Sequence, residues 1–238
     1  MLSNHCFVSA ECARTLARRY AHRVAAGLAL WLCASVSLQA QSLKRQGTSA
    51  SGIVPSEWEY QEATGDLNKD GIADLVVVAT PNFKEYMKAR DDGFVYNFNQ
   101  PLLAVYFGVA QGGFLQWKEY DKVIPARPDE YNNADASLEI TERGTLRIAV
   151  SEYSDMGSYG TTQTTCTYRF QNGDFYLIGK DVMEASRSTG SRTVTSENYL
   201  TWKRQVVTDD LFDESVSPTE RWSNLPRTRL HKLGEEAF

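Results

Sequence analysis

One short segment, residues 66–74, constrains the fold of this chain more than any other. Its sequence, DLNKDGIAD, places oxygen-bearing side chains at relative positions 1, 3, 5 and 9 and a glycine at position 6. A hard cation such as Ca²⁺ takes about six to eight oxygen ligands, which a tight loop with alternate inward side chains can supply. An EF-hand would need a bidentate Glu at position 12, where this chain has Val77 within the apolar run 75–79. The pattern therefore predicts a metal-binding loop that leads into a β-strand.

The segment GDLNKDGIADLVVVA resembles the calcium loop of FG-GAP repeats of the integrin α type, whose pattern is close to D-x-N-x-D-G-x-x-D-L followed by a strand. The resemblance implies Ca²⁺ as the cofactor and a backbone carbonyl ligand at Ile72. Gly71 permits the sharp turn that aims this carbonyl at the ion. The alternative interpretation is an acidic surface turn that binds no metal. The side-chain ligands that the resemblance implies are Asp66, Asn68, Asp70 and Asp74.

The loop occurs once, which departs from the FG-GAP pattern. FG-GAP repeats recur as blades of a β-propeller, and radial repetition needs several blades. The nearest internal echo, residues 172–175, lacks the alternating carboxylates. We therefore expect neither a full integrin-like propeller nor integrin-type ligand binding.

Residues 1–40 have the features of an export signal. A basic region precedes the short apolar segment 25–38, which is followed by the small-residue exit Ser37-Leu38-Gln39-Ala40. The apolar segment is shorter than the roughly 20 residues that span a bilayer, so a cleaved signal is expected rather than a transmembrane helix. Cys33 raises the alternative of a lipoprotein, which the bulky Leu32 before it disfavours. The sequence thus predicts a periplasmic or secreted protein. The basic residues are Arg14, Arg18, Arg19 and Arg23.

Loss of the signal makes the chain more acidic. It removes four of the 25 basic and one of the 30 acidic residues, leaving 21 against 29 and a net charge of −8. This charge argues against nucleic acid or an anionic membrane as a partner. Three of the four cysteines leave as well, so Cys166 remains without an intramolecular disulfide partner in the sequence.

The histidine count limits the enzyme classes that the chain could belong to. Of the three histidines, His231 alone follows the signal, in a polar stretch that we expect to be an exposed tail. A Ser-His-Asp triad or a Cys-His pair needs an imidazole placed in a folded core, and a histidine zinc site needs more than one. Carboxylate chemistry remains open, because a glycosidase needs two acids at a set separation. The best pair is Glu152 and Asp155, although a solvated strand end is the simpler interpretation.

The remaining chain is predicted to be all-β, a single domain of antiparallel strands and hairpins, either sandwich-like or partly propeller-like. Many short β-forming segments are joined by Gly, Asn and Asp turns, which is typical of this class. We expect a flexible linker at 41–54, the β-rich domain at 55–207 and a charged C-terminal tail at 208–238. Strands are expected at 103–108, 114–120, 138–140, 146–150 and 196–207.

The clearest hairpin spans residues 164–180 and turns at Asn172-Gly173. An Asn-Gly turn suits the type I′ geometry of two-residue hairpin loops. The turn and the alternation of apolar residues predict the same register. In this register Phe170 faces Phe175, Tyr168 faces Leu177, and Cys166 faces Gly179 as a small core residue.

The C-terminal third, TYRFQNGDFYLIGKDV followed by SENYLTWK, is similar to a family of uncharacterised bacterial exported proteins with one FG-GAP-like loop. Those proteins commonly show an aromatic-rich hairpin ending in L-I-G and then a segment near N-[FY]-L-T-G-K. Trp202 stands here where that glycine is usual. The resemblance implies a bacterial envelope origin and one continuous domain, and it implies no activity.

These features favour an exported, calcium-binding β-domain of the bacterial envelope that acts as a non-enzymatic binding module. Its partner would be another envelope protein or a glycan. Two alternatives stay open, namely a carboxylate-dependent hydrolase acting on glycans and a calcium-stabilised domain for oligomerisation. Aromatic side chains could stack on sugars, although aromatics also favour strands and cores.

Overall fold

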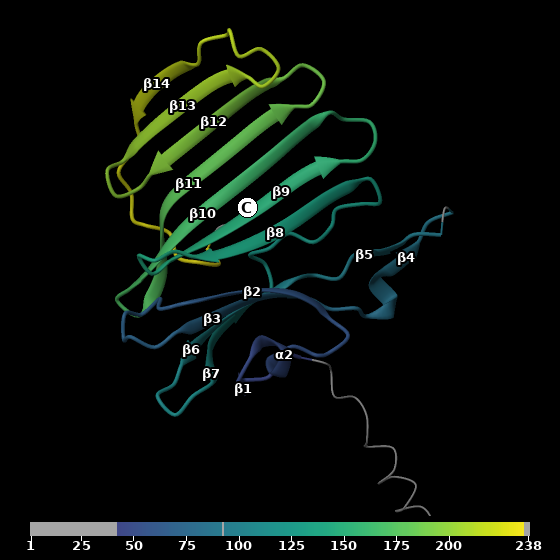
Figure 1. Ribbon diagram of the computed structural model, residues 1–238, viewed down its shortest axis with the longest axis vertical. Coiled ribbons are helices and arrows are strands. Elements are labelled where there is room, and N and C mark those ends of the chain that lie inside the picture. The colour runs from purple at the N-terminus through teal and green to yellow at the C-terminus, as the bar shows by residue number, and fades with distance from the viewer. Residues whose placement is uncertain (1–41, 92, 236–238) are drawn as a thin grey trace, which may run out of the picture. The chain divides into compact units, whose positions relative to one another are not determined.

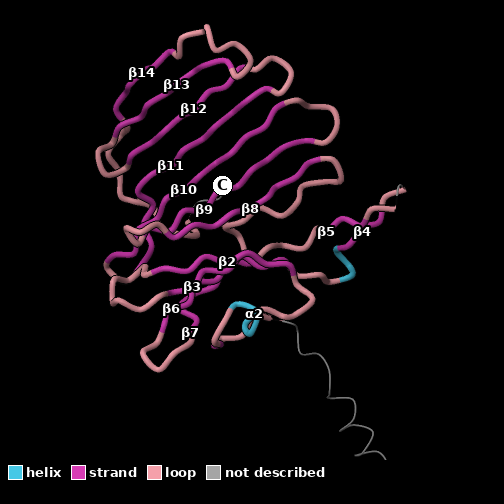
Figure 2. The backbone as a smooth tube through the Cα atoms, viewed as in Figure 1, coloured by secondary structure: helices cyan, strands magenta, loops and turns pink. Residues whose placement is uncertain are grey.

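The computed structural model describes residues 42–91 and 93–235, and the described chain is almost entirely antiparallel β-structure (Figures 1 and 2). The predicted all-β class is confirmed. From Leu43 onward the chain forms one compact unit. The export signal predicted for residues 1–40, with Cys33, lies outside the described residues.

The strands form a five-stranded sheet in the order β1-β7-β6-β3-β2 and a seven-stranded sheet in the order β14-β13-β12-β11-β10-β9-β8, with β4 and β5 as a separate pair. Among the described residues, strands therefore gather in sheets of seven, five and two and do not repeat a four-stranded propeller blade. The elements are β1 (Gln46–Gly47), α2 (Ala50–Ile53), β2 (Glu59–Gly65), β3 (Asp74–Thr80), η1 (Lys84–Tyr86), β4 (Met87–Ala89), β5 (Val95–Asn97), β6 (Leu102–Gly108), β7 (Phe114–Tyr120), β8 (Asn132–Ile140), β9 (Thr145–Ser154), β10 (Gly160–Gln171), β11 (Asp174–Ser186), β12 (Ser191–Asn198), β13 (Lys203–Asp210) and β14 (Thr219–Asn224).

The main core combines one face of each large sheet. Val76, Val78 and Val105 of the five-stranded sheet belong to the same buried cluster as Ile148 and Tyr168 of the seven-stranded sheet. Alternate residues of β3 and β6 enter a second cluster on the other face of the five-stranded sheet. Strands buried on both faces need continuous apolar sequence, which explains the unbroken run at 75–79.

The flexible linker expected at 41–54 is instead part of the fold in its described residues. Leu43 is 5% exposed, and Ile53, in α2, is fully buried in the second cluster. Ser49 caps α2 by accepting a hydrogen bond from the Gly52 N–H at 3.2 Å. The small polar residues concealed a few apolar anchors, whose burial outweighs the flexibility that the composition suggested.

The Asn172-Gly173 hairpin forms as predicted at its closed end. Both turn residues have positive φ angles, 51° and 77°, as a type I′ turn requires. Phe170 pairs with Phe175, and Tyr168 pairs with Leu177. The third predicted pair is wrong, because a bulge at Ile178 shifts the register and places Cys166 opposite Lys180. Cys166 is nevertheless a core residue, 4% exposed.

The strand predicted at 196–207 is a hairpin. β12 ends at Asn198, whose side-chain carbonyl accepts hydrogen bonds from the N–H groups of Leu200 and Thr201, both at 3.0 Å. Trp202 then adopts a left-handed φ of 57° before β13 begins. A left-handed backbone conformation favours glycine. The glycine that the N-[FY]-L-T-G-K pattern has at this position was therefore the signal for a turn.

The C-terminal tail expected at 208–238 also belongs to the fold. It contributes β14, and its later residues run back to the start of β11, where the Leu177 N–H donates to the His231 carbonyl at 2.8 Å. Lys232 bonds to Asp174 at 2.9 Å, and Leu233 is 2% exposed in the main core. Frequent charges in the segment hid the leucine that holds it in place.

Within the described residues, no helix is both long and apolar enough to cross a membrane.

Candidate functional site

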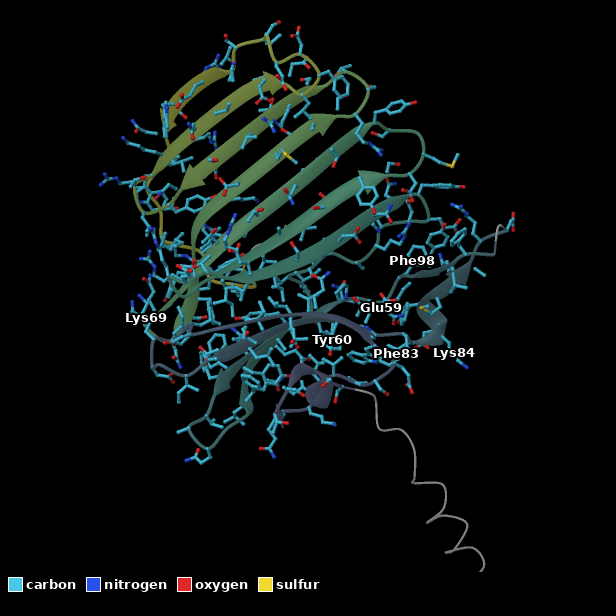
Figure 3. The ribbon with its side chains drawn as sticks, in the orientation of Figure 1. Glu59, Tyr60, Lys69, Phe83, Lys84 and Phe98 are labelled. Carbon is cyan, nitrogen blue, oxygen red and sulfur yellow. The ribbon has the colours of Figure 1, made fainter. Side chains whose placement is uncertain are left out.

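The loop predicted to bind calcium connects β2 to β3. Gly65, the last residue of β2, pairs with Asp74, the first residue of β3, so the loop closes a hairpin. Lys69 and Gly71 supply left-handed turns with φ angles of 64° and 84°. Figure 3 shows Lys69 at this end of the five-stranded sheet, away from Phe83, Lys84 and Phe98 at the other.

Asp74 anchors the loop from inside the protein. Its side chain is fully buried, and one carboxylate oxygen, Oδ2, accepts hydrogen bonds from the Leu67 N–H at 2.8 Å and the Asn68 N–H at 3.4 Å. The other oxygen, Oδ1, accepts from the Gly108 N–H at 2.9 Å. Burial raises the pKa of Asp74 above its usual 3.8 although these three bonds act to lower it, and the nearby charge of Asp70 raises it further.

Gly108 is required by this close approach. A Cβ atom at that position would lie 2.3 Å from the carbonyl oxygen of Ala73 and 2.6 Å from a methyl carbon of Ile72. Any side chain would push the end of β6 away from the loop. The pairing of Asp74 with Gly108, which are 34 residues apart, was not predicted from the sequence.

The other three predicted side-chain ligands lie in the same loop and bond to its backbone. Asp66 accepts from the N–H groups of Lys69 and Gly71 at 2.7 and 2.9 Å. The Asp70 carboxylate accepts from the Ile72 N–H at 2.8 Å and from the Asn68 side-chain amide at 2.9 Å. The Asp70 backbone N–H donates to the Asn68 side-chain oxygen at 3.0 Å. Such short-range side-chain bonds shape turns. The fifth predicted ligand, the Ile72 carbonyl, takes no part in these hydrogen bonds within the loop.

The donor chemistry of the loop fits a hard cation, since it offers three carboxylates and an amide oxygen. A carboxylate oxygen has two lone pairs, so an oxygen that accepts a single N–H bond, such as Oδ1 of Asp74, can take a cation as well. In the part of the chain that the structure describes, no three Asp, Glu, His or Cys side chains lie close enough together to hold a metal ion. Full coordination would therefore need the loop carboxylates to lie closer together than they do in this structure.

The loop packs against the turn between β8 and β9. Gly144, in that turn, has a φ of 70°, and a Cβ there would lie 2.5 Å from the carbonyl oxygen of Asp66. Gly65 lies similarly close to Ile140. The two glycines allow the β2–β3 loop to lie against β8 and the turn that follows it.

A groove begins at this meeting point. Its first part, of about 940 Å³, includes Asp66, Lys69 and the β8–β9 turn, and its second part, of about 640 Å³, runs across β11, β12 and β13 to Trp222 of β14. The two parts have residues in common and so form one groove; these are Arg143, Thr167, Arg169 and Ile178.

The second part of the groove lies on a polar face of the seven-stranded sheet. Thr167 and Arg169 alternate with the core residues Cys166 and Tyr168, so they point to the opposite face. One row of directly opposed residues crosses four strands, namely Asp181, Ser196, Gln205 and Trp222. Trp222 is 58% exposed and donates its indole N–H to Glu220.

Charges in the groove are balanced. The cationic residues lining it are Lys69, Arg143, Arg169 and Lys203, and the acidic residues are Asp66, Glu142, Asp181 and Glu197. Mixed charge, amides, hydroxyls and one exposed indole suit a neutral polar ligand better than a polyanion.

Residues 60–98 match the family model of the FG-GAP repeat. The FG-GAP match covers β2, the loop, β3 and the β4–β5 pair, and it occurs once, as the sequence predicted. It spans 39 of the 238 residues, so the seven-stranded sheet lies outside it. The curated proteins and the solved structures contain no match to the chain.

The residues considered for catalysis are not brought together with the FG-GAP loop. Glu152 is exposed on β9, and Asp155 is exposed in the following loop, where its N–H donates to the Tyr131 carbonyl at 2.7 Å. His231, expected in an exposed tail, is instead half-buried and lines a pocket of about 190 Å³ with Leu177 and Trp202.

Proposed function

We propose that the protein is an exported, calcium-binding β-sheet protein of the bacterial envelope that binds a partner and performs no chemistry on it. The observation that carries the proposal is the junction of the FG-GAP loop with the groove, since Asp66 belongs to both. A bound cation would stiffen the loop that forms one end of the groove. The cation would be held by the Ile72 carbonyl and by the side chains of Asp66, Asn68, Asp70 and Asp74. It would place a fixed positive charge at this end of the groove.

Calcium binding is tested by isothermal calorimetry on the protein after chelator treatment. Asp70→Ala should abolish the heat of binding, because it removes an exposed carboxylate of the loop without disturbing the buried Asp74. The matched control is Asp121→Ala, an exposed aspartate outside the loop, which should bind calcium as the unchanged protein does. Equal heats from both variants, or none from the unchanged protein at millimolar calcium, would refute the metal assignment.

A glycan is the favoured partner for the groove. Its exposed Trp222 offers a ring for stacking on a sugar face, and the row of Asp181, Ser196 and Gln205 offers hydrogen-bond partners for hydroxyl groups. The balanced charge supports a neutral polymer over nucleic acid.

The groove is tested by screening envelope glycans for binding to the protein and to Asp181→Ala. Asp181 lies inside the groove and away from the edge of the sheet. Tyr60→Ala is the control, since Tyr60 is an exposed aromatic residue on β2 that does not line this groove. Binding that survives Asp181→Ala would place the glycan elsewhere, and binding only to an envelope protein would change the partner.

A further inference from the structure

The outer edge of β14 is an unpaired strand edge. β14 pairs with β13 on one side, and no strand among residues 42–91 and 93–235 pairs with its other side (Figures 1 and 2). All six of its residues are exposed. Open edges of this kind pair readily with another strand.

The ladder between β13 and β14 shows which backbone groups face outward. The Leu225 N–H donates to the Trp202 carbonyl at 2.8 Å, one residue beyond the last strand pair. Hydrogen-bonded and non-bonded pairs alternate in an antiparallel ladder. The odd-numbered residues of β14 therefore bond to β13, while Glu220, Trp222 and Asn224 point their N–H and C=O groups away from it.

We propose that two copies of this chain join through β14, antiparallel, about a two-fold axis that passes by Trp222. In this register each Trp222 faces the Trp222 of the second copy, and each Glu220 faces the Asn224 of the second copy. All outward-pointing groups of the strand then meet outward-pointing groups. The result is a seven-stranded sheet continued into its own copy.

The sequence on either side of β14 selects this register. Pro218 and Pro226 stand four residues before and four residues after Trp222. Proline has no N–H and ends a ladder. Centring on Trp222 places the two prolines opposite each other and leaves three bonded residue pairs between them. Moving the centre to Arg221 or Ser223 places a proline opposite an outward-pointing residue and loses a pair.

Charge supports the same choice. Centring on Trp222 places Arg221 opposite Ser223 of the second copy, and no like charges oppose each other. Centring on Arg221 would place two arginines face to face, which destabilises a sheet. The two exposed Trp222 rings would lie side by side on one face, and the grooves of the two copies would meet there.

Sedimentation velocity on the whole chain tests the proposal over protein concentrations up to about 1 mM, because an interface this small binds weakly. The unchanged protein should move from monomer to dimer. Trp222→Pro should remain monomeric, since it removes an outward N–H without touching the bonds to β13. Trp222→Thr keeps that N–H and should still dimerise.

Two substitutions at Asn224 separate the interface from the fold. Lys203 opposes Asn224 within the chain, whereas Glu220 opposes it across the proposed axis. Asn224→Glu should therefore strengthen the pairing of β13 with β14 and weaken the dimer by about 2- to 30-fold, and Asn224→Lys should do the reverse. The proposal would be overturned by a protein that stays monomeric at every concentration or by a dimer that Trp222→Pro leaves unchanged. It would also be overturned if the two Asn224 variants changed dimer affinity in the same direction as the stability of the folded chain. Calcium and glycan binding are measured separately and do not affect this outcome.

Discussion

The carboxylate of Asp74 accepts a hydrogen bond from the backbone N–H of Gly108 at 2.9 Å, and this bond joins the FG-GAP loop to the end of β6. Asp74 is fully buried, so its charge is held by backbone amides alone among the contacts of the described chain. The position of the loop therefore depends on how closely β6 can approach it.

Gly108→Ala should lower the free energy of unfolding by about 2–4 kcal/mol. The new methyl group would meet backbone atoms of Ala73, and the separation would stretch a hydrogen bond to a charged group. Urea denaturation in the presence of chelator measures the effect. In Gly160→Ala the nearest atom lies 3.4 Å from the new Cβ, so that control should change stability by less than about 1 kcal/mol. Similar losses in both variants would mean that the approach of β6 is not restrictive.

Calcium should raise the melting temperature of the protein. A cation that binds the folded state alone adds about 2.7 kcal/mol of stability at one hundred times its Kd, which for a domain of this size is an increase of about 5–10 °C. The shift, followed by circular dichroism, should disappear in Asp70→Ala and persist in Asp121→Ala. A melting curve that is the same in calcium and in chelator would show that the loop does not couple to folding.

Glu197 should make the free energy of unfolding depend on pH in the acidic range. Burial opposes its ionisation, but hydrogen bonds from Tyr199 and Arg204 outweigh burial and hold its pKa below the usual 4.5. A lowered folded-state pKa stabilises the protein above pH 4.5, and this contribution is lost as the pH falls through the folded-state pKa. Glu197→Gln should therefore cost about 2 kcal/mol at pH 7 and progressively less below pH 4.5.

The comparison for Glu197 is Glu139→Gln. Glu139 bonds to Arg147 at 2.9 Å, but their side chains are 56% and 42% exposed, and such pairs contribute less than about 1 kcal/mol. Denaturation series at several pH values would distinguish the two. A pH-independent loss in Glu197→Gln would assign its role to packing instead of charge.

Leu233→Ala should cost about 2–4 kcal/mol, because the leucine is buried in the main core. Leu211→Ala, at a position 48% exposed, should have an effect below about 0.5 kcal/mol. Thermal denaturation of both variants would show whether the C-terminal segment is part of the cooperative unit, and equal stability would return that segment to the status of a tail.

Local patterns predicted the parts of the fold that depend on neighbours in sequence. The left-handed Asn172-Gly173 turn and the alternation around it were sufficient for two of three residue pairs. The third failed because the carbonyl of Ile178 bonds to the Tyr199 N–H at 3.0 Å. This contact joins residues of two hairpins, and nothing near Ile178 signals it.

The candidate site divides in the same way. Side chains at alternate positions placed Asp66, Asn68 and Asp70 in one loop, and the family match supports that loop. The link from Asp74 to Gly108 and the groove reaching Trp222 come from residues far apart in the chain, so their arrangement required the folded structure. Trp202 is the exception, since its departure from glycine could have indicated the turn.

The first residues of β11 have a different neighbour from the last ones. Phe175 and Leu177 bond to the segment around Lys232, whereas residues from Gly179 onward pair with β12. During synthesis the start of β11 therefore lacks its second neighbour until residue 233 has left the ribosome. Its core leucine arrives more than a hundred residues after Val76 and Val105, with which it shares a cluster. Closure through such distant contacts is slow, so the main core is completed late, only when the C-terminal segment has joined it.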